Sequence, residues 1–166
     1  MFLASNVKLG DYVRISALGK KKLVIGTSAN IGDFTQVIIS SSFDNIGEFI
    51  LIGDHVGIGE FSYLGGGGGL NIGNGTIIGQ YFSAHPENHN FDNPVVPIRS
   101  QGVSRKGIVI GENCWIGSKV TILDGVELGA NCIVAAGSVV TKSFKSNDIV
   151  AGVPAKVVGN RISAKK

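Results

Sequence analysis

An aliphatic residue recurs at every sixth position over a long stretch of this chain. From Ile110 onward, the repeated positions are Ile110, Ile116, Ile122, Leu128, Val134 and Val140. A period of six fits neither a 3.6-residue helix nor a simple alternating strand. It fits a short strand followed by a tight corner, and three such units close a triangular coil. Coils of this kind stack at a strand spacing of about 4.8 Å, with each aliphatic side chain pointing inward onto its counterpart in the next coil.

The same repeat runs through the first half of the chain, but its phase shifts after Ile15, Phe43 and Leu64, as corner insertions would cause. The inward positions there are Leu9, Ile15, Ile25, Ile31, Val37, Phe43, Ile46, Ile52, Ile58, Leu64, Ile72, Ile78 and Ala84. We therefore predict an all-β chain, a parallel β-helix of about six coils in a single domain over residues 1–166. Coils are expected over about 9–84 and 108–145, an extended loop over 85–107 and a C-terminal tail over 146–166.

Glycine is unusually frequent, with 25 residues among 166. Tight corners account for part of this excess, because glycine and asparagine tolerate positive φ. We expect such corners at Gly73, Asn74, Gly75, Asn113, Gly125 and Asn131. The run 65–69 is glycine alone and lacks the Lys-Ser/Thr ending of a phosphate-binding loop. It is interpreted either as a flat wall against a ligand or neighbour, or as a tight, flexible coil.

Composition and charge argue against several classes of protein. Apolar residues make up 43% of the chain and charged residues 16%, which argues against disorder. No apolar run is long enough to predict a membrane helix, and residues 1–11 lack the pattern of a signal peptide. The default expectation is therefore a cytoplasmic protein. A net charge of +3 without a nucleic-acid motif predicts no nucleic-acid partner.

The two cysteines test the repeat. Cys114 and Cys132 lie 18 positions apart, which is one full coil, so they should occupy the same inward place on successive coils. We expect two stacked core thiols rather than a catalytic or redox pair. Two cysteines are also too few for the disulfide scaffold of a small secreted protein.

The repeat fails between His85 and Gly107. This stretch holds three of the four prolines and two of the three histidines, His85 and His89. A long loop within a compact repeat domain is often functional. The alternative is a surface insertion without a function. We expect the chemistry of the protein to lie in this loop.

Two stretches of the sequence resemble a known family. The stretch IVIGENCWIGSKVTILDGVELGANCIVAAGSVVTK, followed by AGVPAKVVG, closely matches the C-terminal signature of the hexapeptide-repeat acetyltransferases. The loop NHNFDNPVVPIRSQG is most similar to bacterial surface-polysaccharide and sugar O-acetyltransferases. The resemblance covers nearly the whole chain. It implies a left-handed parallel β-helix, a homotrimer, acetyl-CoA in a groove between two subunits, a sugar or glycan acceptor, and no metal.

His89 is the first candidate for a catalytic histidine. The resemblance places the catalytic imidazole eleven residues after the last aliphatic position before the loop, and this count from Ile78 reaches His89. His85, which precedes a proline as in many family members, is the alternative, and otherwise we expect it at the acceptor. A neutral imidazole can accept the proton of a sugar hydroxyl as its oxygen attacks the thioester, so no acyl-enzyme is needed. Asp92 or Glu87 would orient the ring.

The resemblance also implies residues that bind the co-substrate and the acceptor. Trp115 precedes an inward position, so it should face outward, near the acceptor and the acetyl group. Residues expected along the pantetheine arm and phosphates of CoA are Ser118, Ala136, Thr141, Lys142, Lys156 and Arg161. Their alternative roles are small corner residues and a solubilising tail. Arg99 and Gln101 of the loop are expected to contact sugar hydroxyls.

Three other functions compete with sugar O-acetylation. An acetyltransferase acting on an amino sugar or a small alcohol would use the same loop chemistry. A zinc enzyme resembling the gamma-type carbonic anhydrases would need three histidine ligands, and His55, His85 and His89 are unsuitably spaced for this. His55 is instead expected at an outward position or corner. An inert β-helix used only for assembly is the last alternative.

Overall fold

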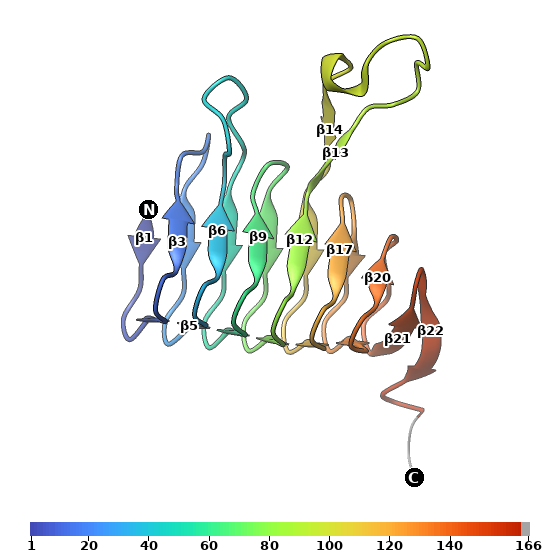
Figure 1. Ribbon diagram of the computed structural model, residues 1–166. Coiled ribbons are helices and arrows are strands. Elements are labelled where there is room, and N and C mark those ends of the chain that lie inside the picture. Colours follow the sequence, from blue (N-terminus) through green and yellow to red (C-terminus); the bar gives the residue numbers. More distant parts are fainter. Residues whose placement is uncertain (164–166) are drawn as a thin grey trace.

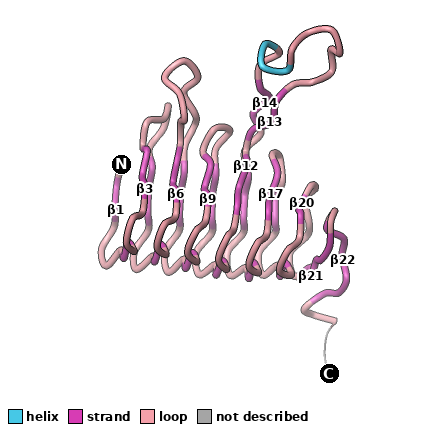
Figure 2. The backbone as a smooth tube through the Cα atoms, in the orientation of Figure 1, coloured by secondary structure: helices cyan, strands magenta, loops and turns pink. Residues whose placement is uncertain are grey.

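Short strands separated by tight corners wind the chain into a three-sided prism (Figure 1). The computed structural model describes residues 1–163. Strands of successive coils pair in parallel and form one sheet on each face of the prism, and we name these sheets A, B and C. Figure 2 shows that nearly all of the regular structure is strand. The architecture is the parallel β-helix that the six-residue period predicts.

Sheets A and C each contain six strands. In spatial order, sheet A consists of β1 (Phe2–Leu3), β4 (Leu23–Ile25), β7 (Ile50–Ile52), β10 (Leu70–Ile72), β15 (Ile108–Ile110) and β18 (Glu127–Leu128). Sheet C consists of β3 (Arg14–Ser16), β6 (Gln36–Ile38), β9 (Tyr63–Gly65), β12 (Ser83–His85), β17 (Thr121–Leu123) and β20 (Val139–Val140).

Sheet B is longer because a terminal hairpin extends it. Its strands are β2 (Lys8–Leu9), β5 (Asn30–Ile31), β8 (Gly57–Ile58), β11 (Ile77–Ile78), β16 (Trp115–Ile116), β19 (Ile133–Val134), β21 (Asp148–Gly152) and β22 (Ala155–Asn160). The strand β21 pairs in parallel with β19, and β22 returns antiparallel to β21. Residues 148–160 are therefore part of the sheet, whereas the sequence predicted a tail from residue 146.

The register confirms the stacking of inward residues. In the last coils Ile110 pairs with Leu128 and Ile116 with Val134, one 18-residue coil apart. In the earlier coils Ile25 pairs with Ile52, a longer separation because a loop leaves the prism between them. The inward side chains form one continuous buried core, and both cysteines are buried in it, as predicted.

Two inward predictions fail for physical reasons. Phe43 is 87% exposed, because residues 40–47 leave the prism as a loop and Phe43 lies on that loop. Leu9 is 42% exposed, because it belongs to the terminal coil, which has no coil beneath it. That coil also begins earlier than predicted: β1 starts at Phe2 and pairs with β4.

The corners use glycine in two different ways. Gly75, Asn113, Gly125 and Asn131 have positive φ, as predicted, but Gly73 and Asn74 do not. Gly73 is needed instead for close approach, because a Cβ there would lie 2.5 Å from the backbone nitrogen of Glu112 in the next coil. The glycine that follows an inward aliphatic residue therefore lets successive coils pack backbone against backbone.

A stack of four aromatic rings follows the corner between sheets B and C. We name Tyr12, Phe34, Phe61 and Tyr81 the aromatic ladder; their ring centroids are 5.0 to 5.2 Å apart in successive coils. Each of the four has a φ between 56° and 59°. A left-handed backbone at a non-glycine residue costs about 1 kcal/mol or more, and the ring stacking offsets part of this. The next two coils place Lys119 at this corner position, and then glycine.

The interruption of the repeat forms a projecting arm, residues 86–107. Its two strands, β13 (Glu87–His89) and β14 (Val103–Arg105), pair antiparallel, and the 3-10 helix η1 (Ile98–Ser100) lies near the tip. Figure 1 shows the arm and the 40–47 loop projecting from the same edge of sheet C. In the part of the chain that the structure describes, no helix has the length and apolar character needed to cross a membrane.

The glycine run 65–69 leads from the end of β9 to the start of β10, at the edge of the prism between these two projections. A Cβ at Gly67 would lie 2.5 Å from Oε2 of Glu87, and one at Gly68 would collide with the carbonyl oxygen of Pro86. A Cβ at Gly69, where φ is +97°, would lie 2.7 Å from the Phe49 ring. The run therefore has an internal packing role: it leaves room for the base of the arm.

Candidate active site

A groove of about 600 Å³ lies on sheet B at its corner with sheet C. It is lined by Gly79, Gln80, Trp115, Gly117, Ser118, Ile133, Val134, Ala135 and Ala136. Three of the predicted co-substrate residues, Trp115, Ser118 and Ala136, therefore come together. The lining is mostly small or apolar, so a thin chain can lie directly on the coil backbone.

Trp115 faces outward, as predicted, and is 59% exposed. The register places Ile77 on one side of it and Ile133 on the other, in the outward row of sheet B. At the corner the hydroxyl of Ser118 donates to Oε1 of Gln80 at 2.9 Å. Gln80 was missed by the sequence analysis; its signal is that it is the second residue after the inward Ile78, as Ser118 is after Ile116.

The other predicted co-substrate residues lie outside this groove. Thr141 and Lys142 follow β20, and Nζ of Lys142 lies 5.8 Å from the centre of the Phe144 ring. Lys156 is exposed on β22, at the extended end of sheet B. Arg161 donates to the carbonyl oxygen of Asn131 at 3.2 Å, so it ties the terminal hairpin to the preceding coil.

His85 ends strand β12 on the outer face of sheet C, where the arm begins. Its ring stacks on Tyr63 with centroids 5.4 Å apart. Tyr63 leans over Gly65, where a Cβ would lie 3.3 Å from the tyrosine ring. Partial burial lowers the pKa of His85, and nearby Glu87 partly raises it again. The lower pKa favours a neutral imidazole near pH 7.

His89 ends β13, four residues further along the arm, and is exposed. Its cross-strand neighbour is Val103. Asp92 is exposed beyond it, and the described residues offer its side chain no hydrogen bond or ion pair. Arg99 is exposed in η1.

Gln101 has a structural role that the sequence analysis did not foresee. Its amide nitrogen donates to the carbonyl oxygens of Val96 at 2.7 Å and Asn93 at 2.9 Å. Its amide oxygen accepts from the backbone of Asn93 at 3.1 Å. Gln101 therefore holds the tip of the arm together. The amide groups that we expected to contact sugar hydroxyls are already used in these hydrogen bonds.

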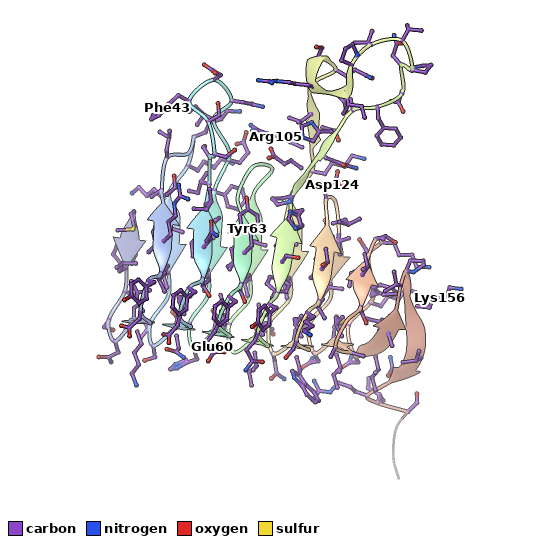
Figure 3. The ribbon with its side chains drawn as sticks, viewed as in Figure 1. Phe43, Glu60, Tyr63, Arg105, Asp124 and Lys156 are labelled. Carbon is purple, nitrogen blue, oxygen red and sulfur yellow. The ribbon has the colours of Figure 1, made fainter. Side chains whose placement is uncertain are left out.

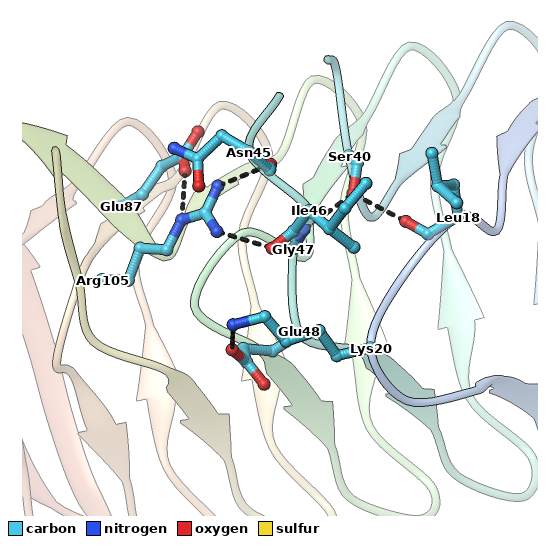
Figure 4. A network of polar contacts seen from close by, with 9 residues as sticks. All are labelled: Leu18, Lys20, Ser40, Asn45, Ile46, Gly47, Glu48, Glu87 and Arg105. Carbon is cyan, nitrogen blue, oxygen red and sulfur yellow. Dashed lines mark hydrogen bonds and ion pairs between the residues drawn. The ribbon is translucent and has the colours of Figure 1, made fainter. Parts of the chain in front are cut away.

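Arg105 joins the arm to the 40–47 loop, as Figure 4 shows. Its guanidinium donates to Oε2 of Glu87 at 3.1 Å, to the carbonyl oxygen of Ile46 at 2.7 Å and to that of Asn45 at 3.0 Å. Glu87, one of the two candidate orienting acids, is therefore paired with an arginine. The sequence analysis missed Arg105 because its partners lie about 60 residues earlier in the chain.

Relatives of this chain agree with its fold and repeat. Residues 107–142 match the family model described as bacterial transferase hexapeptide (six repeats). A Saccharomyces cerevisiae protein named as a candidate acetyltransferase, YJL218W, is 30% identical over 157 residues, covering 93% of this chain and 79% of the relative. The chain belongs to the hexapeptide-repeat acetyltransferase family.

Two bacterial relatives are similar to this acetyltransferase over most of its length. WbbJ of Escherichia coli, named as a candidate lipopolysaccharide-biosynthesis O-acetyltransferase, is 28% identical, covering 79% of this chain and 71% of the relative. The acetyltransferase named for Rv3034c of Mycobacterium tuberculosis is 30% identical and covers 93% of this chain. This chain spans 50% of the length of that relative.

Solved structures show the same fold. AntD, a Bacillus cereus N-acyltransferase in complex with dTDP and 3-hydroxybutyryl-CoA, matches with a TM-score of 0.71 at 20% identity, covering 96% of this chain and 79% of AntD. VCA0836, a hexapeptide-repeat acetyltransferase of Vibrio cholerae complexed with acetyl coenzyme A, matches with a TM-score of 0.56 at 25% identity. The match covers 94% of this chain and 71% of VCA0836. The fold of this acetyltransferase is the left-handed parallel β-helix.

The groove and the histidine-bearing arm lie at opposite edges of sheet C in this acetyltransferase. Gln80 and Ser118 precede β12 and β17, whereas the arm follows the other end of β12. Figure 1 shows the arm projecting away from the edge that carries the groove. One chain therefore does not bring His89 and Trp115 together.

Proposed function

We propose that this protein transfers the acetyl group of acetyl-CoA to a hydroxyl group of a sugar or polysaccharide. The observation that carries the proposal is the groove around Trp115, whose small and apolar lining suits a pantetheine arm in a chain of this family. Acetyl coenzyme A is bound in the related VCA0836 structure. The name of WbbJ supports a glycan as acceptor. A CoA thioester as donor suits a reaction in the cytoplasm.

The groove supplies the donor site in this proposal. Gly117 and Ala136 leave the backbone open to the pantetheine arm, and the exposed ring of Trp115 covers the thioester end of that arm. Lys156 lies on the same sheet, beyond the groove, and is placed to meet phosphate groups. Thr141, Lys142 and Arg161 would contact the co-substrate from outside the groove.

His89 acts as the general base. Its neutral imidazole accepts the proton of the acceptor hydroxyl while that oxygen attacks the thioester carbonyl carbon. The carbon–sulfur bond breaks, and the imidazolium returns the proton to the leaving thiolate, so the protons balance without an acyl-enzyme. Asp92, three residues further along the arm and without a hydrogen bond among the described residues, is the acid that we assign to orient the ring in the assembled site. His85, Arg99 and Trp115 surround the acceptor.

The site is completed by a second copy of the chain in a homotrimer. Since the arm points away from its own groove, its histidines must meet the groove of a neighbouring subunit. A three-sided prism can pack around a threefold axis with identical contacts at each interface. This arrangement supports one shared site at each interface.

N-acetylation of an amino sugar is the second candidate. AntD, with the same fold, is an N-acyltransferase. A small-molecule alcohol as acceptor would use the same groups. Amine and hydroxyl acceptors use the same donor groove and differ in the atom that loses its proton.

Thiol release from acetyl-CoA tests the proposal. It is measured with a panel of sugars, glycans and amino sugars, for the wild type, His89→Ala and His85→Ala. We expect sugar-dependent release, and a loss of about 100-fold or more in His89→Ala, as for removal of a general base. Loss confined to His85→Ala would move the base to His85. Release with amino sugars alone would replace O-acetylation by N-acetylation.

A further inference from the structure

A second pocket lies on the outer face of sheet C, on the three strands that precede β12 and its His85. It has a volume of about 450 Å³. Its lining residues come from β3 and the corner just after it, β6, β9 and the 40–47 loop: Arg14, Ser16, Leu18, Gln36, Ile38, Ser40, Ser41, Ser42, Phe43 and Tyr63. Figure 3 shows Phe43 on the projecting loop and Tyr63 on the sheet. We name it the sheet C pocket.

The lining combines hydroxyl and amide groups with aromatic rings. Phe43 is 87% exposed on the loop wall, and Tyr63 forms part of the floor. The exposed Phe43 ring and the half-buried Tyr63 ring, beside hydrogen-bonding side chains, match both the apolar and the polar surface of a sugar ring. Burial and nearby Glu87 raise the pKa of Tyr63, so its hydroxyl stays protonated and can donate a hydrogen bond.

Arg14 is the one charged residue of the lining. Within residues 1–163 its guanidinium takes part in no ion pair and no side-chain hydrogen bond. Gln36, its neighbour in the register, likewise keeps its amide free among the described residues. A guanidinium without a partner can bind a carboxylate or a phosphate through two parallel hydrogen bonds.

The pocket continues into the region of His85. Tyr63 and Ser41 also line a smaller cavity, together with His85 and Glu87. From β3 to β12 the sheet crosses three strand intervals of about 4.8 Å each. That span matches a short oligosaccharide better than a single sugar.

The pocket wall is held in place from two sides. Ser40 donates to the carbonyl oxygen of Leu18 at 2.7 Å and accepts from the backbone nitrogen of Gly47 at 2.7 Å. On the other side, Arg105 of the arm binds the carbonyl oxygens of Asn45 and Ile46. Figure 4 shows both anchors. The wall is therefore preformed, which lowers the ordering cost of binding.

We propose that the sheet C pocket is a second acceptor subsite, which binds a sugar residue distal to the acetylated one and holds its anionic group on Arg14. This rests on the proposed function, since it assumes a glycan acceptor. The acceptor is then an extended glycan. It carries a carboxylate or phosphate group two or three sugar residues away from the reacting hydroxyl.

Kinetics with matched acceptors test the subsite. The probes are glucose, a neutral glucose trisaccharide, and the same trisaccharide ending in glucuronate or in glucose 6-phosphate. In Arg14→Gln, we expect KM to rise about tenfold or more for a charged trisaccharide, the loss of a charge-assisted contact, with kcat and the KM for glucose unchanged. Lys8→Gln, an exposed cation on sheet B, is the control and should leave every constant unchanged. The two charged probes distinguish a carboxylate from a phosphate ligand.

Direct binding separates failure of the subsite from failure of the proposed function. The charged trisaccharides are titrated calorimetrically into the wild type, Arg14→Gln, Phe43→Ser and the control Lys8→Gln, without acetyl-CoA. We expect binding to the wild type and to Lys8→Gln, and weaker binding to Arg14→Gln and Phe43→Ser, even if no acceptor supports thiol release. Equal affinity in Arg14→Gln and Lys8→Gln, or no binding to the wild type, would overturn the subsite whatever the fate of the acetyl transfer.

Discussion

At the scale of single residues, the glycines of this chain differ in whether close packing requires them, and replacement by alanine tests this difference. Gly68 lies where a Cβ would collide with the backbone of the arm, at Pro86 and Lys106. Gly57 lies in the same β-helix, with nothing within 4 Å of a Cβ. The same added methyl group should therefore destabilise the protein at Gly68 and have little effect at Gly57.

We expect Gly68→Ala to lower the free energy of unfolding by about 1–3 kcal/mol, as overpacking does. Gly57→Ala, the control, should change it by about 0.5 kcal/mol or less. Chemical denaturation measures both. Equal stability of the two variants would show that the arm base does not pack on the glycine run.

The second residue-scale prediction concerns His85. We expect its pKa to lie below the ordinary value of 6.5, because partial burial disfavours the imidazolium. Glu87→Gln removes the negative charge that raises this pKa, so the value should fall further. NMR titration of the ring protons, assigned with His55→Ala and His89→Ala, measures it. A pKa at or above 6.5 would contradict the partial burial of His85, and a rise in Glu87→Gln would contradict the influence of Glu87 on its ring.

At the scale of elements, one side chain, Arg105, links the arm to the 40–47 loop. Arg105 makes three hydrogen bonds, one to Glu87 at the base of the arm and two to the 40–47 loop. It is only 19% exposed, so these charge-assisted bonds are partly shielded from water. An ordinary surface ion pair, Lys20 with Glu48, provides the comparison.

We expect Arg105→Gln to increase hydrogen exchange of the arm, residues 86–107, and of the 40–47 loop by about tenfold or more. Lys20→Gln should leave the exchange of both segments unchanged, because exposed ion pairs contribute little. Mass spectrometry of the exchanged protein follows both segments. Unchanged exchange in Arg105→Gln would mean that the arm is held by its other contacts.

At the scale of the whole molecule, the separation of arm and groove predicts that a single chain is inactive. Light scattering should show a trimer, with the arm of one subunit at the groove of the next. A stable, active monomer would contradict the shared site.

Mixed trimers give a sharper test of the shared site. His89→Ala removes the proposed base, and Ala136→Phe fills the groove, so each variant alone should be inactive. Co-expressed chains in random trimers should regain about one quarter of the wild-type sites, where an intact arm meets an intact groove. Mixtures as inactive as the separate variants would show that both groups act within one chain.

Much of this fold can be predicted from sequence because its information is local. Each hexapeptide pairs an inward aliphatic residue with a corner, so periodicity alone predicted the coils, the buried cysteines and the outward Trp115. The aromatic ladder has a sequence signal that was missed: Tyr12, Phe34, Phe61 and Tyr81 each lie three residues after an inward position. Phe43 was misassigned because it matches the period by chance, within a loop.

Tertiary structure alone decided the features that depend on distant contacts. The partners of Arg105, the packing of the glycine run 65–69 against the arm, and the wall that the 40–47 loop adds to the sheet C pocket each bring together segments that no period relates. The opposite placement of arm and groove likewise follows from the number of strands and corners between them. Repeats determine which side of a strand a residue faces, because strand geometry is local. Which loops then meet depends on how whole coils stack, and only the folded chain contains that information.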